Sequence, residues 1–467
     1  MLSLLIALPF VSALCMFLPV AGRFRRQVLL AVSLVHGLAI ASFWRGLPPS
    51  EWNGFLAVDD MSLLLLTILS GLYLFVAVFM IGYFENEKRS DRTLVVCLLA
   101  LLATMTLSAV SRHLGLLWVA VETSTLFSAP LIGFHRNRES LEATWKYLLV
   151  CSVGIALALM GTFFLAIAAH DTHSLLLPDI LAHASTLSHD WLKLSVIFLL
   201  VGYGCKMGLA PTHSWKPDAY SQAPGMVVVL MAGAVTQCSF LALMRVGQIC
   251  GKAGLGEFYS SILILSGALS LAVPAAMILG ERNIKRAFAY SSVEHMGLLV
   301  LGLGLGGIGV TGAFFHMINN ALAKVVMFLT AGSVDQKYGH CGVGEVRGVI
   351  HTYPVTGALL LVALFAGTGM FPFATFHSEL MILNAAVTPK YYALAVFCVI
   401  CLAIIFVGIA RIVLDVVHGK PTEPVLPKKE NLVMNVPIII AAVFMIVLGL
   451  WIPSRLETLL AGLHGTF

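Results

Sequence analysis

Long runs of apolar residues, separated by short polar segments, dominate the chain from end to end. About 14 of these runs reach 18 residues, which is long enough for a helix to cross a hydrocarbon core of roughly 30 Å. The pattern therefore predicts an all-α membrane protein with transmembrane helices. We expect them at residues 2–20, 27–45, 58–83, 93–111, 113–134, 142–168, 192–211, 224–246, 258–279, 285–305, 309–333, 353–384, 391–416 and 433–453.

Composition agrees with this fold class. The chain has 467 residues, of which 59% are hydrophobic and 11% are charged, whereas soluble domains are about 45–50% apolar and about 25% charged. Because the spans use most of the chain, we expect no separate soluble domain and no catalysis on a water-soluble substrate. Most cysteines sit singly in apolar runs, and the close pair Cys398 and Cys401 is interpreted as two small buried hydrophobes. No iron–sulfur or haem ligand pattern is visible, so we expect no cofactor and no metal.

The lysine and arginine residues indicate the orientation, since cytoplasmic loops hold the excess of them. When the loops are assigned alternately to the two sides, most basic residues, including Lys216, fall on one side. This asymmetry supports the number of spans and predicts both termini on the outer side. The net charge of +5 follows from this topology and indicates no nucleic-acid partner. Three arginines follow the first span and none precedes it, which is typical of a retained helix rather than a cleaved signal peptide.

Two lysines, Lys206 and Lys324, fall well inside predicted spans. A charge at the bilayer centre costs roughly 2.5–3.5 kcal/mol on insertion scales, so such residues face the bundle interior and usually mark an ion or proton path. Lys206 lies close to Gly208 and Pro211. Proline removes a backbone donor and glycine lets the helix open, so we expect a broken span beside a hydrated pocket. A static ion pair at Lys206 is the alternative.

Glu122, in the fifth span, is the predicted partner of Lys206. A carboxyl group among apolar residues becomes neutral unless it is paired. Pairing with Lys206 would create a switch, because a proton that arrives at either partner weakens the pair.

The second half carries a comparable set of titratable residues. His316, Asn320 and Lys324 recur every four residues and so share one helix face. Three groups that hold protons or water on one stripe favour a proton wire over a lone core histidine. Glu294 and His295 lie just upstream, near the expected inner entrance.

A second helix break is predicted at Gly369 and Pro372, which His377 and Glu379 follow. One broken helix in each half, five spans apart, is typical of an inverted repeat. We therefore expect a three-helix segment, two inverted five-helix repeats and a C-terminal helix, at residues 1–92, 93–250, 251–418 and 419–467.

The charged groups expected near mid-depth form a chain with a central gap. It runs from Glu122 through Lys206 and, across the gap, from Lys324 to Glu379. Only Thr236 and Gln237 of the eighth span are expected in the gap, and neither of them titrates.

Several segments carry a family resemblance: VETSTLFSAPLIG, ESLEATWKYLL, GYGCKMGLAPTHSWKPDAYSQAP, IKRAFAYSSVEHMGL, HMINNALAK and FPFATFHSELMIL. Together they resemble the antiporter-like membrane subunits of respiratory complex I, Mrp-type cation/proton antiporters and group 4 membrane-bound hydrogenases. The ESLEATWKY and SSVEHMG stretches are most similar to the hydrogenase-4 component F branch. The resemblance covers nearly the whole chain.

The resemblance implies roles for individual positions. Glu122 matches the family's conserved glutamate, Lys206 its broken-helix lysine, and Lys324 the lysine of the second repeat. Glu379 matches the terminal charged group that faces the next subunit. It also implies a bacterial or archaeal cytoplasmic membrane and other membrane and peripheral subunits as partners.

The sequence departs from the family's pattern at two places. Many complex I relatives carry a lysine where Gln237 stands, so transfer across the centre would need water alone. Lys216 and Tyr220 replace the leucine and histidine of the WLPDAH pattern, which changes the expected inner entry path.

Three functions remain open from the sequence. The first is a proton-translocating subunit of a membrane-bound hydrogenase or related complex-I-type redox assembly, without a redox centre of its own. The second is a cation/proton antiporter or a membrane subunit for inorganic-carbon uptake. The third is an inert anchor whose charges serve helix packing.

Overall fold

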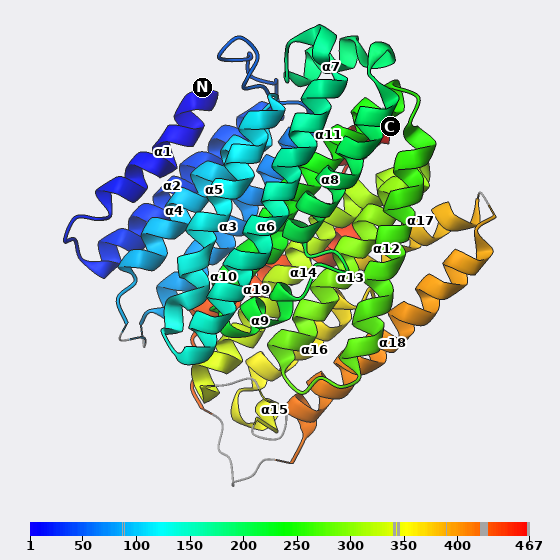
Figure 1. Ribbon diagram of the computed structural model, residues 1–467. Coiled ribbons are helices and arrows are strands. Elements are labelled where there is room, and N and C mark those ends of the chain that lie inside the picture. Colours follow the sequence, from blue (N-terminus) through cyan, green and yellow to red (C-terminus); the bar gives the residue numbers. More distant parts are fainter. Residues whose placement is uncertain are drawn as a thin grey trace.

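The computed structural model describes residues 1–85, 87, 89–339, 342, 346–388, 390–420 and 428–464. Within these residues the chain is a bundle of helices joined by loops and isolated β-bridges (Figure 1). The α-helices are α1 (Leu2–Cys15), α2 (Gly22–Phe43), α3 (Asp60–Tyr83), α4 (Arg92–Val110), α5 (Leu114–Ile132), α6 (Arg138–Ala168), α7 (Leu177–Ala182), α8 (His189–Met207), α9 (Trp215–Gln222), α10 (Gly225–Leu230), α11 (Thr236–Lys252), α12 (Gly256–Ile278), α13 (Ile284–Leu305), α14 (Ile308–Tyr338), α15 (Val349–Thr352), α16 (Pro354–Gly367), α17 (Ala374–Val387), α18 (Tyr392–His418), α19 (Leu432–Leu450) and α20 (Ser454–His464).

Among the described residues, 11 helices are long and apolar enough to cross a membrane, and α1 and α16 are shorter apolar helices. This confirms the prediction of an all-helical integral membrane protein. The predicted span 192–211 is shorter than expected, because α8 ends at Met207. The C-terminal helix α20 was not predicted, since Arg455, Glu457 and Thr458 stand among its apolar residues and it forms no long apolar run.

The helices differ in how much lipid-facing surface they keep. The apolar window of the continuous stretch α10–α11 is 100% buried and that of α13 is 94% buried, whereas those of α2 and α18 are 33% buried. Figure 1 shows α18 along one outer edge of the bundle. The buried helices α13 and α14 carry the polar residues of the second half and α10–α11 carries Gln237, so helix packing shields these residues from lipid.

Two of the helices are interrupted, and the interruptions share one local sequence pattern. The stretch Gly208–Pro211 separates α8 from α9, and Gly369–Pro372 separates α16 from α17. In each, the glycine has a left-handed φ, of 76° at Gly208 and 63° at Gly369, and the peptide bond before the proline is cis. A positive φ is costly for residues with a Cβ, which explains glycine at both positions.

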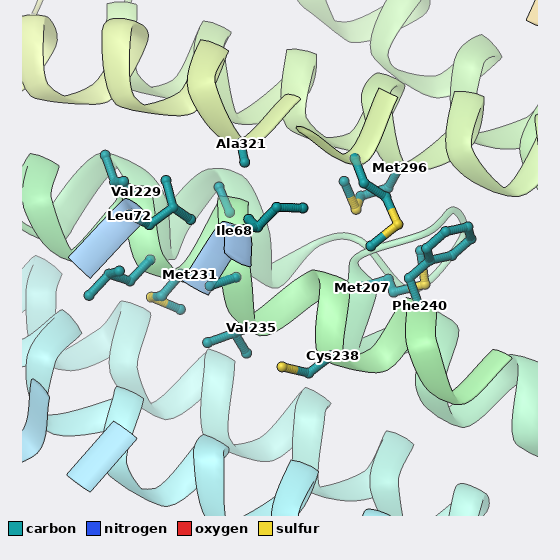
Figure 2. Close-up of a cluster of buried hydrophobic side chains, with 14 of the residues drawn as sticks. Ile68, Leu72, Met207, Val229, Met231, Val235, Cys238, Phe240, Met296 and Ala321 are labelled. Carbon is teal, nitrogen blue, oxygen red and sulfur yellow. The ribbon is translucent and has the colours of Figure 1, made fainter. Parts of the chain in front are cut away.

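The helix that crosses the bundle centre is irregular as well. A π-helical segment at Met231–Val235 joins α10 to α11 directly before Thr236 and Gln237. Such segments occur frequently at functional sites. Figure 2 shows the apolar side chains around this region, where Met207, Phe240 and Met296 gather close together. Apolar packing thus separates the end of α8 from α13.

A polar cluster joins the first three helices to the rest of the bundle. Asp59, the N-cap of α3, accepts hydrogen bonds from both terminal nitrogens of Arg245, one of them at 2.8 Å, and from Arg112. Arg245 is 1% exposed, although it stands at the end of the predicted span 224–246. Both chain ends lie at this end of the bundle (Figure 1), where Met1 contacts Glu51 and Gly462 approaches Asp60.

Candidate functional site

Lys206 lies in the last turn of α8 and its side chain is fully buried. Its ammonium donates hydrogen bonds to Thr125 Oγ1 on α5 at 2.8 Å and to Tyr147 OH on α6 at 2.5 Å. The Tyr147 hydroxyl contacts Ser128 Oγ at 2.6 Å. A buried ammonium is costly unless it is hydrogen-bonded, and neutral hydroxyls supply the partners here.

Glu122 reaches Lys206 through one intermediate group rather than by direct contact. In the described parts of the chain, no ion pair within 4.0 Å joins the two. Thr125 Oγ1 instead donates to Glu122 Oε2 at 3.3 Å while it accepts from Lys206. The direct pair expected from the sequence is therefore replaced by a bridged one. Glu122 is half-buried, so this end of the network lies near the bundle surface.

The second half gathers Lys324 with two acids. Lys324 on α14, Glu294 on α13 and Glu379 on α17 are all buried, and the charges of both carboxylates act on the lysine. Glu294 Oε2 and Glu379 Oε1 have no hydrogen-bond partner among the described residues. Buried polar atoms of this kind are normally satisfied by ordered water.

Gly369 makes room for Glu379. A Cβ built on Gly369 would lie 2.0 Å from Glu379 Oε2. Glycine is thus required at position 369 for two reasons. The backbone there has a left-handed φ, and the Glu379 carboxylate occupies the space that a side chain would need.

Two histidines form a hydrogen-bonded chain beside this cluster. His295 Nε2 lies 3.1 Å from the carbonyl oxygen of Gly367, His295 Nδ1 lies 2.9 Å from His316 Nε2, and His316 Nδ1 lies 2.9 Å from Ser378 Oγ. A carbonyl oxygen can only accept, so Nε2 of His295 carries a proton. With both rings neutral, His316 then donates to His295, and its Nδ1 accepts from Ser378 when the single hydroxyl proton of Ser378 turns away from the carbonyl oxygens of Thr375 and Ala374. All hydrogen bonds of the chain point the same way, as a proton wire requires.

The centre of the bundle holds amide side chains. Gln237 Nε2 donates to the carbonyl oxygen of Met317 at 2.8 Å, while Gln237 Oε1 and both polar atoms of Asn320 have no partner within the part of the chain that the structure describes. His316, Asn320 and Lys324 lie on α14, and all three are buried. The amides suit water molecules as partners and carry no exchangeable charge of their own.

Lys216 lies in this region and not in a solvated loop. It is fully buried, and its Nζ donates to the carbonyl oxygens of Met207 at 2.7 Å and Ser292 at 3.1 Å. Met207 is the last residue of α8, whereas Ser292 belongs to α13. The assignment of Lys216 to a basic loop was therefore wrong, because packing of α9 against α13 covers it.

His377 lies apart from the other candidate residues. It is half-buried on α17, its ring is edge-on to Phe315 with centroids 5.8 Å apart, and it lines an apolar cavity between α17 and α18. The structure brings it into no contact with Lys324 or the histidine pair among the described residues. The donor atoms of His295, His316 and Glu379 do lie within 4.8 Å of one another.

Sequence reasoning missed Thr125, Tyr147 and Lys216 as site residues. Thr125 lies one helical turn after Glu122, a spacing that places both on one face. Tyr147 gave no such signal, because its role depends on how α6 packs against α8. Lys216 could have been found from its departure from the WLPDAH pattern, which places a cation directly after a helix break.

Comparisons with known proteins identify the family and the fold. Residues 111–406 match the family described as NADH:quinone oxidoreductase/Mrp antiporter, TM. The chain is 31% identical over 363 residues to a "Hydrogenase-4 component F homolog" of Methylacidiphilum infernorum, which covers 76% of this chain and 75% of that protein.

Two solved structures share the fold. A chain of the archaeal membrane-bound sulfane sulfur reductase superposes with a TM-score of 0.89 at 22% identity, covering 100% of this chain and 97% of that chain. A chain of the Mrp complex from Dietzia sp. DQ12-45-1b gives 0.87 at 20% identity, covering 99% and 96%. The resemblance read from the sequence motifs is confirmed: the chain belongs to the NADH:quinone oxidoreductase/Mrp antiporter family of membrane proteins.

Proposed function

We propose that this chain is a proton-translocating, antiporter-like subunit of a membrane-bound hydrogenase or a related complex-I-type redox assembly. The observation that carries the proposal is the fully buried ammonium of Lys206, held by two hydroxyls at the end of a broken helix. Intramembrane ionisable groups that face the bundle interior usually mark ion or proton paths. Relatives whose names include hydrogenase-4 and NADH-quinone oxidoreductase support the context.

The first half works as an electrostatic switch. Thr125 relays between Glu122 and Lys206, so a change of charge at Glu122 alters how strongly the ammonium is held. Glu122 is half-buried, so a subunit packed against this face of the bundle would lie close to it. A partner that changes its own charge beside Glu122 would thus release or recapture the proton on Lys206.

The second half receives and delivers the proton. Lys324 lies under the influence of Glu294 and Glu379, whose unpartnered oxygens leave room for water. The histidine chain from Ser378 to Gly367 is polarised in one direction. A proton can pass from ring to ring within this chain, while the Gly367 carbonyl oxygen, which takes no proton, orients the ring of His295.

We also propose 14 spans in two inverted repeats, within residues 93–250 and 251–418. Adding α1, α8 and the α16–α17 pair to the 11 long apolar helices gives this number. An even number of spans fits two termini at one end of the bundle (Figure 1). In each repeat the fourth element is the broken one, with the glycine three residues before the proline.

The basic side of the bundle is assigned to the cytoplasm of a bacterial or archaeal cell, which puts both termini on the outer side. The expected partners are the other membrane and peripheral subunits of the assembly. Solved relatives belong to multi-subunit membrane complexes. Co-purification tests this context: subunits with iron–sulfur clusters support a redox assembly, whereas small membrane or zinc-containing partners favour the antiporter or carbon-uptake alternative.

The function is tested in inverted membrane vesicles that contain the intact complex. Lys206→Ala and Glu122→Gln should each abolish acidification of the vesicle lumen, while electron transfer to a soluble dye stays near normal. Lys193→Ala, an exposed position on the same helix α8, and Glu257→Gln, an exposed position on α12, are matched controls. Unchanged pumping in both test variants would defeat the proposal.

A further inference from the structure

An apolar contact separates the two groups of titratable residues, that of Lys206 in the first half of the chain and that of Lys324 in the second half. Met207 follows Lys206 directly in α8, and Met296 follows His295 in α13. Figure 2 shows the side chains of Met207 and Met296 together with Phe240. The side chains at this contact carry no titratable group, and Gln237 on α11 cannot accept and release a proton as a lysine does. A proton that crosses between the halves needs another titratable group.

Lys216 spans this contact. Its Nζ binds the carbonyl oxygen of Met207 on one side and that of Ser292 on the other, at 2.7 and 3.1 Å. Ser292 lies one helical turn or less from Glu294 and His295 on α13. The charges of Lys216 and Lys324 act on each other, and Lys216 also acts on His295. One side chain therefore touches the end of the Lys206 helix and faces the titratable groups of the second half.

We propose that Lys216 is the central proton relay between the two halves, in place of a lysine at the position of Gln237. This inference rests on the proposed proton-translocating function. In the first transfer, an Nζ–H bond of Lys206 breaks and a new Nζ–H bond forms on neutral Lys216, with water as the carrier. In the second, Lys216 returns to the neutral amine as its proton passes toward Lys324. One proton and one positive charge move, and no electron is exchanged.

The hydrogen bonds of Lys216 suit this role. An ammonium has three donors, and two of them are used by the carbonyl oxygens. After loss of one proton, the amine keeps two N–H groups for the same carbonyls, and its lone pair takes the third direction. Lys216 can therefore change its charge without giving up its contacts with α8 and α13. An arginine could make the same contacts but would keep its proton.

If Lys216 only clamps α8 to α13, Lys216→Arg should pump normally, because arginine can make the same contacts. If Lys216 relays protons, Lys216→Arg should pump poorly. The test measures proton pumping and dye reduction by the intact complex in inverted vesicles, with Lys206→Ala as reference for the proposed function. Lys216→Arg is expected to lower the pumping rate by about tenfold or more at near-normal dye reduction. Lys285→Arg is the matched control, because Lys285 is equally buried but forms an ion pair with Asp335 at 2.9 Å. It should pump at nearly the wild-type rate.

A rescue variant keeps the test decisive if arginine prevents assembly. Lys216→Met is expected to assemble without pumping, and adding Gln237→Lys should restore at least part of the rate. Pumping by Lys216→Arg at the wild-type rate, or equal rates for Lys216→Met with and without Gln237→Lys, would overturn the relay while leaving the function intact. If Lys206→Ala also pumps normally, the proposed function itself fails.

Discussion

Replacement of Gly208 by alanine tests whether the first helix break and Lys216 form one unit. A Cβ at Gly208 would lie 2.7 Å from Cδ, 3.1 Å from Cε and 3.2 Å from Nζ of Lys216. Ordinary van der Waals contacts begin near 3.4 Å, so the lysine stem has to withdraw by about 0.7 Å. Lys216 is fully buried and its ammonium is held by two carbonyl oxygens, so the stem moves only if the ammonium moves with it.

The cost of this substitution has two parts. An L-residue in the left-handed region costs about 1–2 kcal/mol. Withdrawal of the ammonium lengthens its bonds to Met207 and Ser292, and a hydrogen bond to a charged group is worth about 1.5–3 kcal/mol. Loss of one of them brings the expected destabilisation by Gly208→Ala to about 2.5–5 kcal/mol.

Gly254 provides the matched control. It has the same φ of 76°, and a Cβ there meets nothing within 4 Å, so Gly254→Ala should cost the backbone part alone. The free energy of unfolding of both variants can be measured by denaturation of the purified protein in mixed detergent micelles. In a Lys216→Ala background the extra cost of Gly208→Ala should disappear, since the stem is gone. Equal costs for the two glycines, or an unchanged cost in that background, would refute the reasoning.

Two further predictions concern Tyr147 and Glu430. Tyr147→Phe removes one of the two hydroxyls that bind Lys206, so proton pumping by the intact complex should fall. Tyr259→Phe is the control: it breaks a buried hydrogen bond of 2.6 Å to the carbonyl oxygen of Leu243, which involves no lysine, and should leave pumping unchanged. Burial raises the pKa of Glu430, but hydrogen bonds from Thr356 and Val355 and the charge of Lys337 outweigh it and hold that pKa below its ordinary value. The stability that Glu430 provides is therefore complete above the ordinary pKa and is lost as the pH falls through the lowered pKa. Melting temperatures of the purified protein from neutral pH to about pH 3 should fall less steeply for Glu430→Gln than for wild type, and parallel curves would contradict this.

The sequence predicts the helices well because the bilayer imposes a length and a composition on each span. It also places Lys206 and Lys324 inside spans, since a charge within an apolar run is visible without any knowledge of packing. The two glycine–proline pairs are equally visible. All of these signals are local, and each depends on a physical requirement that a single helix has to meet.

The contacts of the site were less accessible from the sequence. Thr125 bridges Glu122 and Lys206 only because α5 faces α8, and Tyr147 joins them from α6. Lys216 stands among polar residues and Pro217, as loop residues commonly do. Its burial results from packing of α9 against α13, which no local pattern reveals.

The two helix breaks pose the same problem and solve it with titratable groups. A helix end leaves carbonyl oxygens without partners, and inside a membrane each of them has to find a donor within the protein. The carbonyl oxygen of Met207, at the end of α8, binds Lys216 Nζ, and that of Gly367, at the end of α16, faces His295 Nε2. Neutral lysine keeps enough N–H groups to hold its carbonyl, and the Gly367 carbonyl keeps a second donor, Ser291 Oγ at 3.4 Å, if His295 gives up its Nε2 proton. Each break thus keeps a donor on its carbonyl oxygen whichever charge state the titratable group beside it has, which lets a broken helix and a titratable side chain share one place in the bundle.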